Sequence, residues 1–130
     1  MKVIDILNSP KPTISLEVFP PKTDAVYASV EQAVEKIADL KPSYMSVTYG
    51  AGGGTSSHTV NIAKHIQCDK GVTAIAHLSC ISSTHDLVHQ QLIKLKEAGI
   101  ENILALRGDI PEGFEMDNLD YHYASDLAKE

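Results

Sequence analysis

Four segments of this chain end in chemically capable side chains, and these side chains recur at nearly constant spacing. Glu17, Thr48, His77 and Arg107 follow one another at intervals of 31, 29 and 30 residues. This is the length of one strand–helix–strand unit, and each of the four stands at the C-terminal end of an apolar run. In sheets and barrels built from such units, ligands and catalytic groups collect at that edge. The sequence therefore predicts an α/β protein with an active site at the C-terminal ends of its strands.

The apolar runs cover residues 13–19, 44–49, 72–78 and 102–106 and are typical of strands. They are nearly continuous, which favours parallel strands that are buried on both faces. Helical patterns lie between them, with an apolar stripe over 26–37 and a weaker pattern over 55–67. Right-handed crossovers between such neighbours predict a parallel sheet in the order 1-2-3-4, and a short helix over Val3–Leu7 is expected to close its bottom.

The helix before the fourth strand carries end signals in the sequence. Thr84 is placed to act as its N-cap, and Gly99 suits a left-handed C-cap after which Ile100 folds back on the helix. A further helix is expected to begin near Tyr121 and to be cut off at Glu130 in mid-pattern, because no stop signal follows.

Length and charge limit the classes of protein that this chain can represent. Its 130 residues suffice for one domain, whereas a complete (β/α)8 TIM barrel needs at least about 200. Four strand–helix units are half of such a barrel, so truncation has to be considered. If the units do belong to a barrel, the chain is a single domain over residues 1–130 that holds its first four strand–helix units and is truncated in the fourth helix. A net charge of −6 without a dense basic cluster argues against nucleic acid or anionic membranes as partners.

Neither a targeting segment nor a metal site is apparent. No apolar run approaches the roughly 20 residues of a membrane span, and the first residues lack the apolar stretch of a signal peptide. Cys68 and Cys80 form no CxxC pair, and Cys80 reads better as a small buried residue than as a nucleophile. His85 and His89 share a helical face without an acidic or thiol partner, so solvated histidines are expected there. A cytoplasmic protein without a bound metal is predicted.

Glu17 is an acidic residue inside an otherwise apolar strand. A carboxylate in that position is either paired structurally or held protonated in a dry pocket, where a raised pKa suits a general acid. Strand context alone leaves both interpretations open. Pro20 and Pro21 end the strand and fix the loop that follows the acid.

A glycine-rich turn over residues 49–55 joins a strand to a helix, which is where backbone amides can hold an anion. It lacks the full dinucleotide fingerprint, so ligand contact is favoured only modestly over a flexible loop. His77 ends a buried strand, where a ligand-facing role and a satisfied core histidine are equally plausible. Arg107 and Asp109 are opposite charges at a strand mouth, separated by Gly108, and they either pair with each other or bind a ligand.

Together these segments resemble the methylenetetrahydrofolate reductase family. The resemblance rests on LEVFPPKT (16–23), SVTYGAGG (46–53), AHLSC (76–80), ALRGDIP (105–111) and YASDL (123–127), in this order. It implies a (β/α)8 flavoprotein that uses FAD and a reduced nicotinamide, NADH or NADPH, to convert 5,10-methylenetetrahydrofolate into 5-methyltetrahydrofolate.

The resemblance also implies residue roles. Glu17 matches the general acid that protonates the N10 side of the folate, and Asp109 matches a carboxylate that stabilises the resulting cation and binds the pterin. Both are thereby catalytic and substrate-binding. The positions that match FAD contacts are Thr48, Tyr49, Gly50, Ala51, His77, Arg107, Gly108, Asp109, Tyr123 and Ala124.

Two alternatives accompany this hypothesis. One is another cofactor-using barrel that acts on a pterin or a phosphorylated ligand. The other is a catalytically silent fragment or pairing module, because the first and fourth strands would be open edges that invite pairing with a second chain. A homo-oligomer is expected.

Overall fold

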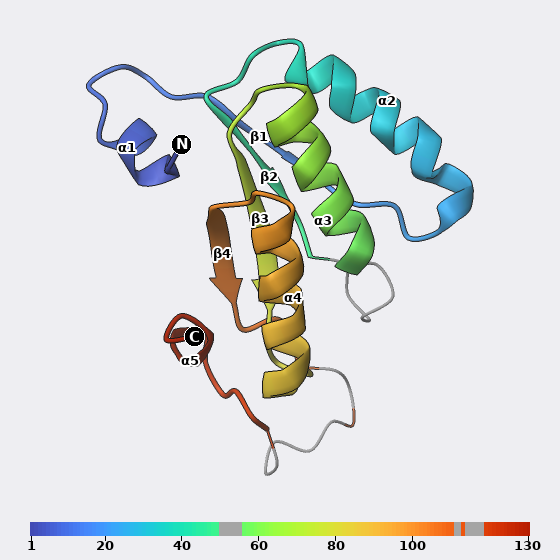
Figure 1. Ribbon diagram of the computed structural model, residues 1–130, viewed down its shortest axis with the longest axis vertical. Helices are drawn as coiled ribbons and strands as arrows, with labels where there is room; N and C mark the ends of the chain where they lie inside the picture. The colour runs from blue at the N-terminus through green and yellow to red at the C-terminus, as the bar shows by residue number, and fades with distance from the viewer. Residues whose placement is uncertain (50–55, 111–112, 114–118) are drawn as a thin grey trace.

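The computed structural model comprises residues 1–130 and describes all of them except 50–55, 111–112 and 114–118 (Figure 1). Strands and helices alternate along the chain after a short N-terminal helix. In chain order the elements are α1 Val3–Leu7, β1 Ser15–Val18, η1 Asp24–Val26, α2 Tyr27–Ala38, β2 Tyr44–Val47, α3 Ser56–Lys64, η2 His65–Asp69, β3 Ala74–Ser79, α4 His85–Glu97, β4 Asn102–Leu106 and α5 Ala124–Leu127.

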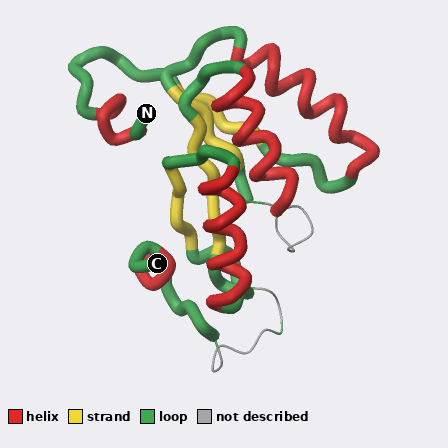
Figure 2. The backbone as a smooth tube through the Cα atoms, viewed as in Figure 1, coloured by secondary structure: helices red, strands yellow, loops and turns green. Residues whose placement is uncertain are grey.

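The four strands form one parallel sheet in the order β1-β2-β3-β4, as the sequence predicts. Helices α2, α3 and α4 lie along one side of the strands, which Figure 2 shows as red coils beside yellow strands. Connecting helices confined to one face, with neighbouring strands in sequence order, match one part of a barrel wall and not a doubly wound sheet. The fold class predicted from the sequence is confirmed.

The main core lies between this helical layer and the sheet. Alternate strand residues point into it, and Met45, Val47, Ala74 and Ala76 are completely shielded from solvent. The alanines on β3 leave room for α3, whose Ala63 is equally buried. Close packing of this kind fixes the distance between helices and sheet, and therefore the places where the strands end.

The opposite face of the sheet is open. The pocket on this face has a volume of about 750 Å³, and α1 forms its floor. Leu104 on β4 is 44% exposed. The expectation of strands buried on both faces is therefore wrong for this chain, because among the described residues only α1 is seen to lie against the inner face. The residues that line the pocket are Lys2, Val3, Ile4, Leu7, Ser15, Glu17, Tyr44, Ser46, Ile75, His77, Glu101, Asn102, Ile103 and Leu104.

The predicted ends of α4 are confirmed. The Thr84 hydroxyl accepts a hydrogen bond from the Leu87 amide at 3.3 Å. At the other end Gly99 has φ +78°, and the Ile100 amide donates to the Leu95 carbonyl at 2.9 Å. These contacts satisfy backbone groups that an α-helix leaves unpaired at its ends.

The last helix differs from the prediction. It begins at Ala124 and not near Tyr121, because the Asp126 carboxylate accepts the His122 and Tyr123 amides and holds both residues outside the helix. It ends at Leu127, so it does not extend to Glu130.

Two side chains near this helix, Tyr121 and His85, contact the carboxylate of Glu130. Tyr121 is buried and its hydroxyl donates to Glu130 Oε1 at 3.1 Å. His85 Nδ1 lies 2.8 Å from the same carboxylate oxygen. His85 is thus partnered, contrary to the expectation of a solvated histidine, although its side chain is largely exposed.

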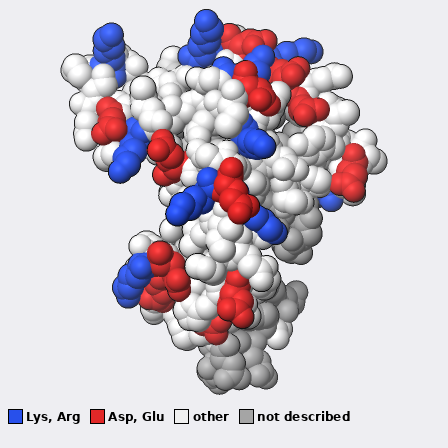
Figure 3. All heavy atoms as spheres, in the orientation of Figure 1, with Lys and Arg blue, Asp and Glu red and all other residues white. Residues whose placement is uncertain are grey.

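The surface carries both signs of charge. Lys and Arg side chains alternate with Asp and Glu on the face shown in Figure 3, without a large area of either sign. Within the described ranges, no helix has the length and apolar character needed to cross a bilayer. No group of three or more His, Cys, Asp or Glu side chains in these ranges is arranged to hold a metal ion.

Candidate active site

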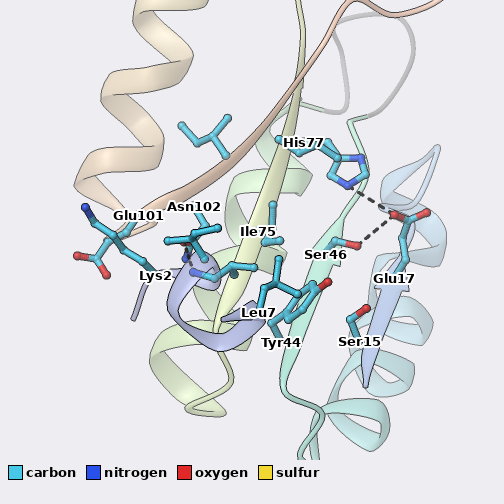
Figure 4. Close-up of a pocket in the computed structure, with 14 residues that line it drawn as sticks. Lys2, Leu7, Ser15, Glu17, Tyr44, Ser46, Ile75, His77, Glu101 and Asn102 are labelled. Carbon is cyan, nitrogen blue, oxygen red and sulfur yellow. Dashed lines mark hydrogen bonds and ion pairs between the residues drawn. The ribbon is translucent and has the colours of Figure 1, made fainter. Parts of the chain in front are cut away.

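Glu17 and Ser46 stand side by side at the open face of the sheet. Parallel pairing of β1 with β2 sets the two residues opposite each other. Because side chains alternate between the faces of a strand, both point away from the helical layer and into the pocket. The Ser46 hydroxyl donates to Glu17 Oε2 at 3.1 Å (Figure 4).

His77 reaches the same carboxylate from β3. Its Nε2 lies 3.5 Å from Glu17 Oε2. The side chain is only 9% exposed, and Nε2 is shielded from solvent without a hydrogen bond of good geometry. Burial lowers the pKa of the imidazole, and the nearby Glu17 charge raises it again in part. The balance favours a neutral imidazole with an unused polar atom beside Glu17.

Thr48 is held at the end of β2 by its backbone. Its amide donates to the Val18 carbonyl at 3.0 Å, and its carbonyl accepts from the buried Thr59 hydroxyl at 3.0 Å. The Tyr49 ring packs against the second apolar cluster, around Leu78. The other two residues predicted to contact a flavin here, Gly50 and Ala51, lie outside the described residues.

The Arg107–Asp109 turn follows β4 and is tied to β3. The Arg107 carbonyl accepts from the Ser79 hydroxyl at 3.0 Å and from the Ile81 amide at 2.8 Å. Gly108 has φ +88°, and a methyl group there would overlap the Ser79 hydroxyl. The side chains of Arg107 and Asp109 are exposed and form no ion pair with each other. The structural ion pair between Arg107 and Asp109 that the sequence left open is therefore not formed.

Tyr123 and Ala124 lie at the start of α5. Tyr123 is 66% exposed, and Ala124 is half-buried. Beneath them the buried Cys80 thiol is 3.9 Å from the Tyr123 carbonyl and 4.0 Å from that of Arg107. Burial raises the pKa of this thiol, so Cys80 stays protonated and acts as a small core residue, as expected from the sequence.

The structure thus brings Glu17, Ser46 and His77 together. Glu17 and His77 are site residues predicted from the sequence, and Ser46 is found only in the structure. The Arg107–Asp109 turn and the Tyr123–Ala124 pair follow the same C-terminal edge of the sheet. Sequence reasoning missed Ser46. The signal for it was present, because aligning the two strand ends at Glu17 and Thr48 places Ser46 on the same face as the acid.

Comparisons with known proteins identify the family of this chain. The family model described as methylenetetrahydrofolate reductase matches residues 2–130. The 5,10-methylenetetrahydrofolate reductase of Escherichia coli (strain K12) is 38% identical over 114 residues, which are 88% of this chain and 38% of that protein. Methylenetetrahydrofolate reductase 1 of Schizosaccharomyces pombe is 35% identical over 136 residues, 99% of this chain and 23% of that protein.

A plant relative gives the same result. Methylenetetrahydrofolate reductase (NADH) 1 of Zea mays is 33% identical over 112 residues, 86% of this chain and 19% of that protein. The chain therefore spans between about a fifth and two fifths of the length of these relatives. The family model covers nearly every residue, and on that ground the chain belongs to the methylenetetrahydrofolate reductase family.

Proposed function

We propose that this chain forms the N-terminal half of an FAD-dependent barrel that reduces 5,10-methylenetetrahydrofolate to 5-methyltetrahydrofolate with a reduced nicotinamide. The observation that carries the proposal is the group of Glu17, Ser46 and His77 in an open pocket at the C-terminal half of the strands. Family membership suggests the class of reaction, and the position of Glu17 in the pocket suggests which residue donates the proton.

Features of the described residues fit a bound flavin. His77 carries a buried ring nitrogen without a hydrogen-bond partner, which a polar ligand atom would satisfy. Gly108 has a backbone conformation that side chains rarely adopt, so backbone rather than side chain faces the mouth of β4. We assign Thr48, Tyr49, His77, Arg107, Gly108, Asp109, Tyr123 and Ala124 to the FAD site, with Gly50 and Ala51 from the adjoining loop. When bound and reduced by the nicotinamide, the flavin would supply the hydride that the folate receives.

In this proposal Glu17 delivers a proton to the N10 side of the folate. The carboxyl is about half exposed at the pocket, so a substrate can reach it directly. Asp109 is exposed at the mouth of β4, on the same C-terminal edge of the sheet, where its negative charge stabilises the cation formed when the five-membered folate ring opens. A general acid of this kind contributes roughly 100-fold or more to a rate.

The test separates the two half-reactions in a full-length reductase that carries this segment. Glu17→Gln removes the proton donor but keeps the shape of the side chain, so folate reduction should fall by at least roughly 100-fold while flavin reduction by the nicotinamide stays nearly intact. Glu101→Gln is the matched control, because it makes the same change at the other end of the same pocket (Figure 4). An equal fall of both half-reactions would instead assign Glu17 a structural role.

A second function is favoured by the open face itself. Within the described residues β1 and β4 each pair with one neighbouring strand, and Ile103 and Leu104 at the β4 edge are 39% and 44% exposed. Such an edge can pair with a second copy of this chain and make a homo-oligomeric, catalytically silent module. Sedimentation of the 130-residue chain tests it: Ile103→Lys should shift dimers to monomers, whereas Ile4→Lys on α1 should not. If the 130-residue chain by itself acts as the reductase, the same preparation should be yellow and show flavin absorbance. A silent module should be colourless.

A further inference from the structure

The contacts of Glu17 are one-sided. The Ser46 hydroxyl donates to Oε2, and His77 Nε2 faces the same oxygen at 3.5 Å. The described residues provide no hydrogen bond to Oε1. Among these residues the carboxyl group is therefore held by one oxygen, Oε2, which faces both Ser46 and His77 (Figure 4).

This arrangement has a consequence for the proton. A hydrogen bond donated to a carboxylate oxygen stabilises negative charge on that oxygen and uses one of its lone pairs. A proton on Glu17 is therefore carried better by Oε1 than by Oε2. The contact from Ser46 therefore fixes the orientation of the carboxyl group and with it the oxygen that carries the proton.

We propose that Ser46 is a positioning residue that fixes Glu17 by its Oε2 oxygen beside His77 and so leaves Oε1 to carry the proton. The inference rests on the proposed role of Glu17 as the acid in folate reduction. The strand register makes the contact possible, because Ser46 and Glu17 are direct neighbours on β2 and β1. Ser46 itself touches no part of the reaction and acts through Glu17.

His77 provides a readout that does not depend on catalysis. The negative charge of Glu17 raises the His77 pKa against the lowering effect of burial. Among the charged groups that line the pocket, Lys2 and Glu101 lie at its opposite end, which leaves Glu17 as the charge beside the ring (Figure 4). A carboxylate that drifts away from His77 therefore lowers the pKa of His77.

The first experiment is a histidine titration of the 130-residue chain by NMR, with His77 assigned by its loss in His77→Gln. Glu17→Gln should lower the His77 pKa. Ser46→Ala should produce most of that shift, because the freed carboxylate is half exposed and turns toward water. Ser46→Thr keeps the hydroxyl and should restore the original value. Ser15→Ala is the matched control, since Ser15 lines the same pocket without a bond to Glu17.

A double-variant cycle decides the case. In the Glu17→Gln background, Ser46→Ala should cause no further shift of the His77 pKa, because the charge that it positions is gone. A His77 pKa that is unchanged or raised in Ser46→Ala, or that shifts equally in both backgrounds, overturns the proposal. If Ser46→Ala does not fold, Ser46→Cys replaces it, because the thiol is a weak donor of similar size.

The second experiment separates this inference from the proposed function. In the full-length reductase, Ser46→Ala should slow folate reduction roughly tenfold, a part of the ~100-fold or more expected of a general acid, and leave flavin reduction intact. Ser46→Thr should recover the rate. If the His77 titration behaves as expected but the full-length protein reduces no folate, the reductase assignment is overturned and the positioning role of Ser46 stands. A normal folate rate in Ser46→Ala overturns the positioning role.

Discussion

At the scale of single residues, the turn after β4 depends on two small residues, Gly108 and Ser79, that meet closely. Gly108 has φ +88°, and the space where its Cβ would lie is filled by the Ser79 hydroxyl. That hydroxyl donates to the Arg107 carbonyl at 3.0 Å. A larger residue at either position would displace the backbone that presents Arg107 and Asp109 at the strand mouth.

We expect Gly108→Ala to destabilise the chain by about 2–3 kcal/mol, from the left-handed backbone strain and the displaced Ser79 bond. Gly99→Ala is the control, because Gly99 has φ +78° with nothing near its Cβ, and it should cost only about 1–2 kcal/mol. Urea unfolding measures both. In a Ser79→Ala background the cost of Gly108→Ala should fall to that of the control, and an unchanged cost would refute the proposed overlap.

Tyr121 predicts how stability responds to alkaline pH. Burial, and then its hydrogen bond to Glu130, raise the pKa of Tyr121 to about 12. The folded state therefore favours the neutral phenol, so this stabilisation is complete below the unfolded pKa of about 10 and is lost as the pH rises toward 12.

The free energy of unfolding should thus decline between about pH 10 and 12, and Tyr121→Phe should flatten that part of the curve. Denaturant titrations across this range provide the measurement. Tyr123→Phe removes a hydroxyl that is mostly exposed and should keep the slope. A slope that persists unchanged in Tyr121→Phe would show that other groups cause it.

At the scale of elements, one side chain attaches α1 to the sheet. Asn102 Oδ1 accepts the Val3 amide at 2.8 Å, and its Nδ2 donates to the Met1 carbonyl at 3.0 Å and to the Ala74 carbonyl at 3.2 Å. A helix of five residues has little stability of its own, so this amide and the buried Val3 side chain hold it in place.

Asn102→Ala should release α1 and leave the rest of the sheet folded. Hydrogen exchange of the amides in residues 3–8 should accelerate towards the rates of an unstructured segment, whereas exchange in β3 and β4 should change little. Asn61→Ala on the exposed side of α3 serves as the control. Continued protection of residues 3–8 in Asn102→Ala would show that the packing of Val3 and the ion pair of the Met1 ammonium with Glu101 suffice.

At the scale of the whole molecule, α2, α3 and α4 cover one face of the sheet while the inner face is open. The open face holds the acid, the buried histidine and a pocket of about 750 Å³. Parallel sheets are usually covered on both faces, so an exposed apolar edge beside a polar inner face is typical of a sheet that packs against other polypeptide. Affinity for a large cofactor would then depend on groups from both sides of the pocket.

We therefore expect the isolated 130-residue chain to bind FAD weakly and to show no reductase turnover. Fluorescence titration with FAD, together with sedimentation, measures affinity and association state. The full-length reductase, titrated in parallel, should bind FAD tightly. Tight one-to-one binding of FAD by a monodisperse monomer of this chain would contradict the prediction.

The order of the strands and the ends of α4 could be predicted from the sequence. Nearly continuous apolar runs at a spacing of one crossover unit leave few topologies, and Thr84 and Gly99 act through bonds to residues close by in the chain. Glu17, His77 and Arg107 could be proposed as site residues for the same reason, since parallel strands gather their C-terminal ends at one edge.

The tertiary structure alone decided which of these groups touch. The contact of Ser46 with Glu17 depends on the register of β1 against β2, and a shift by one residue would turn Ser46 to the other face. The start of α5 at Ala124 depends on the carboxylate of Asp126, and the partner of His85 comes from Glu130, 45 residues away. The local sequence pattern predicts where each strand and helix forms, because those elements depend on residues close by in the chain. The long-range contacts form only when the packed elements bring distant side chains together.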